Sequence, residues 1–122
     1  MLMAFTEEIR VGRRGLPING FPYMMRIYIN NQVLIPANLI RSLGLDRVRY
    51  VDVIMEYNGQ KIELGNVRLL KTRHTDSRQF TIPREVRERY GIKPFDEVII
   101  HMIIPRQKAM INASIRGLIQ IN

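Results

Sequence analysis

Two segments of the chain share one pattern of apolar and polar positions, in which a short apolar run ends at a proline and apolar residues then recur four positions apart. The segments are residues 32–45 and 79–92, and they align without a gap. Apolar residues spaced i, i+4 lie on one face of a helix. The pattern therefore predicts a strand followed by a short helix in each segment, and it indicates an internal duplication.

Proline and glycine mark where both predicted helices begin and end. Pro36 and Pro83 follow the apolar runs, and proline suits the first helical turn because its φ is preset and its missing N–H would be unpaired there. Gly44 and Gly91 come about two turns later, where a left-handed residue ends a helix. Each copy is therefore predicted to be a strand, a two-turn helix and a further strand.

Alternating and β-branched runs predict the other strands. They are Tyr23–Ile29, Tyr50–Tyr57, Lys61–Leu64 and Val67–Arg73, with turns at Asn30-Asn31, at Asn58-Gly59 and at His74–Arg78, and with Gly65-Asn66 separating the copies. A two-turn helix beside a lone hairpin is marginally stable. We therefore expect the copies, residues 23–66 and 67–122, to close into one β-rich barrel domain.

The repeated unit resembles a known family of DNA-binding domains. The pattern Gln-x-[Leu/Thr]-Ile-Pro-x-x-[Leu/Val]-x-x-x-[Leu/Tyr]-Gly-[Ile/Leu], followed in the second copy by Lys93-Pro94-Phe95-Asp96 and an apolar strand, is similar to the AbrB/MazE/SpoVT swapped-hairpin domain. The resemblance covers roughly residues 23–104. It implies a mainly β fold with short helices, a swapped-hairpin barrel of cradle-loop type, built here as an intramolecular pseudodimer. The second copy departs from the family at Phe95, where glycine is common.

The two ends of the chain differ in character. Residues 1–22 are rich in glycine, proline and arginine and predict an irregular basic arm. Its arginines either reach into a DNA groove or belong to a terminus that is disordered or lies along the surface. The segment 109–122 is apolar. It is either the strand that closes the barrel, at about 117–121, or a segment that binds a protein partner or a second copy.

The positive charge is concentrated in one part of the sequence. The formal net charge is +8 and the pI is about 10.4, and residues 67–93 carry eight basic residues against three acidic ones. A solvated charged face is the ordinary explanation of such a run. Clustering on a recognisable module favours a polyanion site instead, because cations that contact phosphates release bound counterions.

The family resemblance and the charge together predict the residues that contact double-stranded DNA. The main candidates are Arg73, Arg78, Arg84 and Arg87, and the secondary ones are Lys71, Arg26, Arg41, Arg10, Arg13 and Arg14. The resemblance implies that Arg87 and Arg41 are helix arginines that meet DNA. Because the copies differ at these positions, binding is expected to be asymmetric and to suit a site that is not palindromic.

Other classes of function have weaker support in the sequence. The chain has no cysteine and two histidines on separate segments, so neither thiolate chemistry nor a transition-metal site is expected. We expect no cofactor, no membrane segment, a cytoplasmic location and no enzymatic activity. The alternatives are an antitoxin or interaction module that acts through the apolar C-terminal segment and, less favoured, a nucleotide-dependent enzyme of the related cradle-loop barrels.

Overall fold

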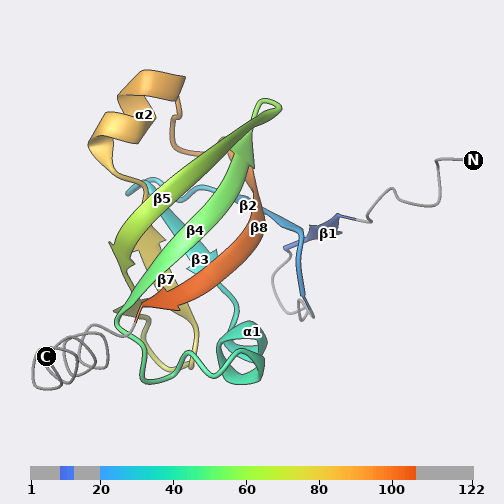
Figure 1. Cartoon of the computed structure of the whole chain (residues 1–122), viewed down its shortest axis with the longest axis vertical. Coiled ribbons are helices and arrows are strands. Elements are labelled where there is room, and N and C mark those ends of the chain that lie inside the picture. Colours follow the sequence, from blue (N-terminus) through green and yellow to red (C-terminus); the bar gives the residue numbers. More distant parts are fainter. Residues whose placement is uncertain (1–8, 13–19, 107–122) are drawn as a thin grey trace, which may run out of the picture.

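The computed structural model describes residues 9–12 and 20–106, which form a mainly β structure with two short helices. In chain order the elements are β1 (Arg10–Val11), β2 (Tyr23–Arg26), β3 (Gln32–Ile35), α1 (Ala37–Ser42), β4 (Tyr50–Tyr57), β5 (Gln60–Arg68), β6 (Leu70–Lys71), β7 (Arg78–Thr81), α2 (Arg84–Tyr90) and β8 (Glu97–Arg106). Figure 1 shows α1 and α2 at opposite ends of the molecule.

The strands form two sheets. A five-stranded sheet has the order β1-β2-β8-β4-β5 and a three-stranded sheet the order β3-β7-β6. Neither sheet closes into a barrel within the described residues, so the closed barrel predicted from the sequence is corrected. The edge strands are β1 and β5 in the large sheet and β3 and β6 in the small one, and among the described residues no strand pairing joins an edge of one sheet to an edge of the other. The predicted closing strand at 117–121 lies outside the described residues.

Corresponding strands of the two copies pair with each other. β3 pairs antiparallel with β7, and Val33 lies opposite Phe80, its own counterpart in the repeat. β4 pairs antiparallel with β8, and Ile54 lies opposite Met102, one residue from its counterpart. The two copies therefore share both sheets and one hydrophobic core.

The strand β5 corrects the strand break predicted at Gly65-Asn66. Gly65 and Asn66 do not end it. They form a bulge opposite Asp52, where the pairing register of β4 with β5 shifts. Asn66 has a φ of 57°, and its N–H donates to Asp52 Oδ1 at 2.7 Å. Asparagine tolerates this left-handed conformation, so β5 runs on through Arg68 and leaves β6 as the short first strand of the second copy.

The predicted helix boundaries are confirmed. Pro36 and Pro83 are the N-caps of α1 and α2. Gly91, the C-cap of α2, has a φ of 71°, and Gly44, just beyond α1, has a φ of 67°. The Asn58-Gly59 hairpin is confirmed as well, because both residues have positive φ, as a type I′ turn requires.

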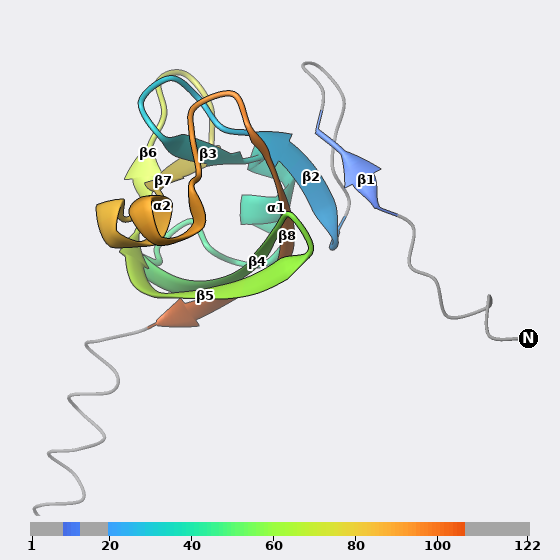
Figure 2. The ribbon, with the colours of Figure 1, turned by 90° about the horizontal axis from the view of Figure 1, so that it is seen from above.

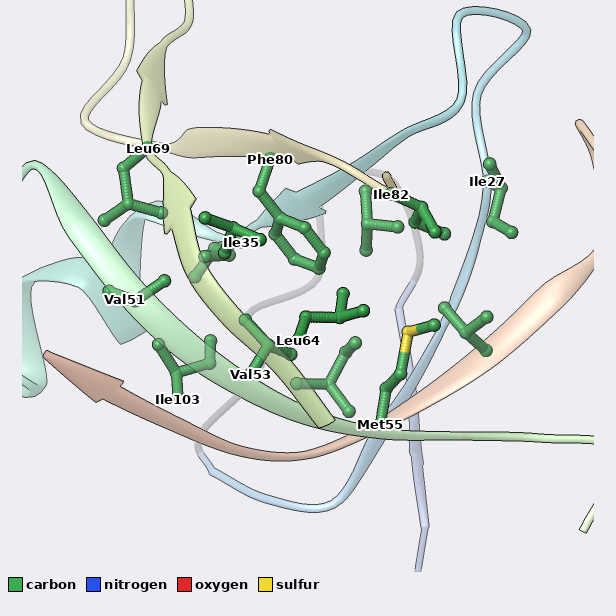
Figure 3. Packing of buried hydrophobic residues seen from close by; sticks show 14 of the residues in the cluster. Ile27, Ile35, Val51, Val53, Met55, Leu64, Leu69, Phe80, Ile82 and Ile103 are labelled. Atoms are coloured by element: carbon green, nitrogen blue, oxygen red, sulfur yellow. The ribbon is translucent and has the colours of Figure 1, made fainter. Parts of the chain in front are cut away.

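The core lies between the two sheets. Alternate residues of β4, from Val51 to Tyr57, are buried along its whole length, as expected for a strand with one face on the core. Figure 3 shows Phe80 from the small sheet pointing into the interior, toward Val53 and Leu64 from the large one. All three are almost completely buried.

The two hairpins that lead into β3 and β7 differ in length. Residues 29–31 lie between Tyr28 and Gln32, where the Tyr28 N–H donates to the Gln32 carbonyl, whereas residues 73–76 lie between Thr72 and Ser77, where the Thr72 N–H donates to the Ser77 carbonyl. Both connections project on the same side of the molecule, away from β4 and β5 (Figure 2). The connection in the second copy is therefore one residue longer, and residues 71–78 around it hold three of the predicted DNA contacts, Lys71, Arg73 and Arg78.

Candidate nucleic-acid interface

The long loop of the second copy, residues 71–78, presents Lys71 and Arg73 to solvent. Both side chains are exposed, and within the described part of the chain neither has a hydrogen bond or an ion pair. The hydroxyls of Thr72, Thr75 and Ser77 hydrogen-bond to one another inside the loop. This hydroxyl cluster gives the loop a defined shape, from which two free cations project.

Arg78, at the end of the same loop, has a different place from the one predicted. It is only 6% exposed. Its Nη1 donates to the carbonyls of Asp76 at 2.6 Å and Ser77 at 3.2 Å, and its Nη2 donates to that of Asp46 at 3.0 Å. Because the guanidinium is enclosed and satisfied by backbone oxygens, we remove Arg78 from the candidate DNA contacts. It ties the loop of the second copy to the turn after α1.

Arg41, on α1, also connects the first copy to the loop of the second copy, through Asp76. Its Nη1 lies 3.0 Å from Asp76 Oδ2, and its side chain is 59% exposed. Exposed pairs of this kind contribute little to stability. A shallow depression of about 570 Å³ lies beside the pair and is also lined by Ala37, His74 and Thr75. Arg41 is therefore held next to the long loop while most of its side chain stays accessible.

Two further arginines at this end were missed by the sequence reasoning. Arg47 and Arg49, in the turn after α1, are exposed and have no side-chain partner among the described residues. The adjoining backbone fixes their place, because Asp46 O accepts from Arg78 and Arg49 O accepts from Leu69 N at 2.8 Å. The signal was present in the run Asp46-Arg47-Val48-Arg49, which stands in the first copy where the second copy has the turn Lys93-Pro94-Phe95-Asp96.

We call the segments 37–49 and 71–78 together the basic end of the molecule. They contain six basic residues and two acidic ones, a net charge of +4. The corresponding segments of the other end, 84–96 and 29–31, contain four basic and three acidic residues, a net charge of +1. The sequence placed the charge on the second copy, whereas the fold gathers it where the second copy's loop meets the first copy's helix and turn.

The predicted contacts at the other end are partly neutralised. Arg84 Nε lies 3.1 Å from Glu88 Oε2, one helical turn on, and Arg26 Nη2 lies 3.9 Å from Glu97 Oε2. Arg87 is half-buried and donates from Nε to the carbonyl of Ile82 at 2.9 Å. These three arginines are therefore less available to phosphates than the free cations of the basic end.

The N-terminal arm is described only around β1. Arg10 is exposed, and its Nη1 donates to the carbonyl of Phe21 at 3.0 Å. β1 pairs parallel with β2 at the edge of the large sheet, which fits the interpretation of a segment that lies along the surface. Arg13 and Arg14 lie outside the described residues.

The titrating groups with shifted pKa values have structural roles. The Tyr57 hydroxyl donates to Asp96 Oδ2 at 2.7 Å, and this hydrogen bond lowers the pKa of Asp96 and raises that of Tyr57. The backbone N–H of Lys93 also donates to this carboxylate and lowers its pKa further. Burial alone raises the pKa of Tyr23. None of these groups lies at the basic end.

A metal centre or a membrane-spanning helix would change the interpretation of the site. No group of three or more acidic, histidine or cysteine residues suited to a metal ion occurs among residues 9–12 and 20–106. The described part of the chain also contains no helix of the length and apolarity needed to cross a membrane. His101 sits on a bulge of β8 and shares a hydrogen bond with Glu56, with Nε2 and Oε1 2.8 Å apart.

Comparison with family models, with curated proteins and with solved structures returns no match.

Proposed function

We propose that this chain is a DNA-binding protein, a transcriptional regulator or architectural binder of AbrB-like type, which contacts double-stranded DNA through its basic end. The single observation that carries the proposal is the exposure of Lys71, Arg73, Arg47 and Arg49 at one end without acidic partners in the described structure. A local positive field of this kind attracts phosphates and gains free energy from counterion release. The proposed contacts are these four residues and Arg41, with Arg84, Arg87, Arg26 and the arm arginines secondary.

The strand pairing supports a swapped-hairpin pseudodimer as the architecture behind this function. β3 meets β7 and β4 meets β8, so each sheet is built around a pair of counterparts from the two copies. In a homodimer of identical halves both ends would carry the same charge. A fused chain lets one hairpin loop lengthen and become cationic, so we propose that the protein has one DNA-binding end and binds asymmetrically.

A salt series on duplex DNA tests the proposal. We compare the double variant Lys71→Ala/Arg73→Ala with a control, Arg89→Ala/Lys93→Ala, which removes the same charge from exposed residues at the other end that are not among the proposed contacts. The first variant should lose affinity at low salt. Its plot of log affinity against log salt should become less steep by about two, since each phosphate contact contributes a slope of roughly −0.9. The control should change much less.

Two results would contradict the proposal. Equal losses in the two double variants would mean that only the overall charge matters and that the basic end is not the site. A wild-type protein that fails to bind duplex DNA at any salt concentration would remove the function itself. Turnover assays with nucleotide and Mg²⁺, run in parallel, test the proposal that the chain is not an enzyme.

A second candidate, a protein-interaction or antitoxin module, is favoured by one observation. Met102 and Ile104 are 47% and 40% exposed on the outer face of β8, the strand that leads into the apolar segment 109–122, which lies outside the described residues. Deleting 109–122 separates the candidates. Loss of a co-purifying partner with DNA binding intact would favour this function, whereas loss of the folded state would make the segment part of the core.

A further inference from the structure

Gln32 and Gln79 are counterparts in the two copies, but their side chains have different hydrogen bonds. The Gln32 amide is occupied on both sides, because Nε2 donates to Thr81 Oγ1 at 3.3 Å and Oε1 accepts from Asn30 Nδ2 at 2.9 Å. The Gln79 amide has no partner among the described residues. A half-buried amide with an unused donor and an unused acceptor can make two hydrogen bonds to a ligand.

Gln79 lies on the outer face of the small sheet. Its neighbours Arg78 and Phe80 in β7 are buried toward the core, and alternation along a strand therefore turns Gln79 to the opposite face. Directly across from it are Leu34 of β3 and Leu70 of β6. Cross-strand partners share a face, so the free amide stands between two half-buried leucines in one row.

This row matches the major-groove edge of an A·T pair. Adenine presents an N7 acceptor and an N6 donor there, which a glutamine amide can bind with two hydrogen bonds, and thymine presents a methyl group that packs against apolar side chains. A G·C pair offers neither a methyl group nor this order of donor and acceptor. Because a leucine lies on each side of Gln79, the amide is the one polar group in the row. This arrangement favours a single position of the sheet along the DNA.

The surroundings of Gln79 fit double-stranded DNA as the ligand. The long loop follows Leu70 and carries the exposed Arg73. Lys71 pairs with Arg78 and therefore leaves β6 on the opposite face from Leu70, at the edge of the sheet. A two-stranded antiparallel ribbon fits the major groove of B-form DNA, while the major groove of double-stranded RNA is too narrow for it. β6 adds only Leu70 and Lys71 to the ribbon formed by β3 and β7. The cations would hold the phosphates while the ribbon meets the base edges.

We propose that Gln79 is a specificity-determining residue that reads adenine in the major groove, with Leu34 and Leu70 against the thymine methyl. The inference rests on the proposed function and goes beyond it, because it separates a base-reading row from the phosphate-binding cations. Its counterpart Gln32, whose amide is already satisfied, does not read a base.

Selection of duplexes from a random pool with the wild-type chain, followed by affinity measurements on single-pair substitutions, tests this inference. At one base-pair position of the selected site, the wild type should bind a duplex with A·T more tightly than a duplex with G·C, by roughly tenfold to a hundredfold in affinity. Gln79→Ala should lose that preference and Gln32→Ala should retain it. Replacing the adenine at that position by 7-deazaadenine, which lacks N7, should weaken binding by the wild type and leave binding by Gln79→Ala unchanged.

Two readouts separate base reading from a structural role. Gln79→Ala should keep the circular dichroism spectrum and the thermal midpoint of the wild type, and its salt dependence should be unaltered because no phosphate contact is lost. The inference would be overturned if Gln79→Ala kept the wild-type base preference at every position of the site. It would also be overturned if Gln32→Ala lost that preference to the same extent as Gln79→Ala. Tighter binding to double-stranded RNA than to DNA would overturn it as well.

The outcomes also distinguish this inference from the proposed function. A wild type that binds all duplexes equally, with affinity lost in Lys71→Ala/Arg73→Ala, would overturn the role of Gln79 and leave an architectural DNA binder. A wild type that binds no duplex would overturn both.

Discussion

Replacing Arg78 by methionine tests whether this residue belongs to the core of the loop or to the DNA interface. Methionine keeps much of the aliphatic volume and removes the guanidinium, which leaves the carbonyls of Asp46, Asp76 and Ser77 without their donor. A hydrogen bond from a charged group contributes about 1.5–3 kcal/mol when it is well formed and buried. Two of the three bonds are only partly buried, so we expect a loss of about 3 kcal/mol in the free energy of unfolding.

Urea unfolding followed by circular dichroism measures this loss, because the chain contains no tryptophan for a fluorescence assay. Each kcal/mol corresponds to about 4–8 °C in Tm for a domain of 60–100 residues and to about 2–4 °C for one of 150–250 residues. For this chain of 122 residues, a loss of about 3 kcal/mol should therefore lower the thermal midpoint by roughly 10–15 °C. The control is Arg73→Met, five residues earlier in the same loop, where an exposed side chain without a partner should change stability by less than about 0.5 kcal/mol. An Arg78→Met variant as stable as that control would refute the structural role.

Two further predictions concern the other end of the molecule. Gly91→Ala places a β-carbon at a φ of 71° and should lower the free energy of unfolding in urea by about 1 kcal/mol. Gly91→Asn should recover part of this loss, because asparagine tolerates the left-handed conformation. Equal stability of Gly91→Ala and the wild type would contradict the left-handed cap. The hydrogen bond from Tyr57 lowers the pKa of Asp96 in the folded state. The ionised Asp96 carboxylate therefore stabilises the fold fully above about pH 4, and this stabilisation is lost as the pH falls through the folded-state pKa. Tyr57→Phe should therefore flatten the acid side of the plot of urea midpoint against pH, and an unchanged slope would argue against this coupling.

Local patterns were sufficient to predict the helices and the tight hairpin. Pro36 and Pro83 act through a preset φ, and Gly44, Gly91 and Asn58-Gly59 act through their tolerance of positive φ. These are properties of single residues and their immediate neighbours, so the sequence alone carries them. The same reasoning misjudged Gly65-Asn66, because a glycine-asparagine pair suits a bulge as well as a turn and only the pairing with Asp52 chooses between them.

The candidate site was less predictable from the sequence. Lys71 and Arg73 were expected to be cationic contacts, and the structure leaves both exposed. Arg78 looks the same in the sequence, yet its alternation in β7 turns it inward, where three carbonyls surround it. Arg47 and Arg49 were not selected because their proximity to the loop arises from contacts between distant parts of the chain.

By itself the sequence determined the duplication, the strand-helix-strand unit and the excess of positive charge, since these depend on residue types and short spacings. Only the tertiary structure decided which copy's loop meets which copy's helix, and hence that Lys71, Arg73, Arg47 and Arg49 come together at one end, next to the sheet that carries Gln79. The physical reason is that electrostatic fields and hydrogen-bond satisfaction depend on distances through space. Those distances are set by the pairing of β3 with β7 and of β4 with β8.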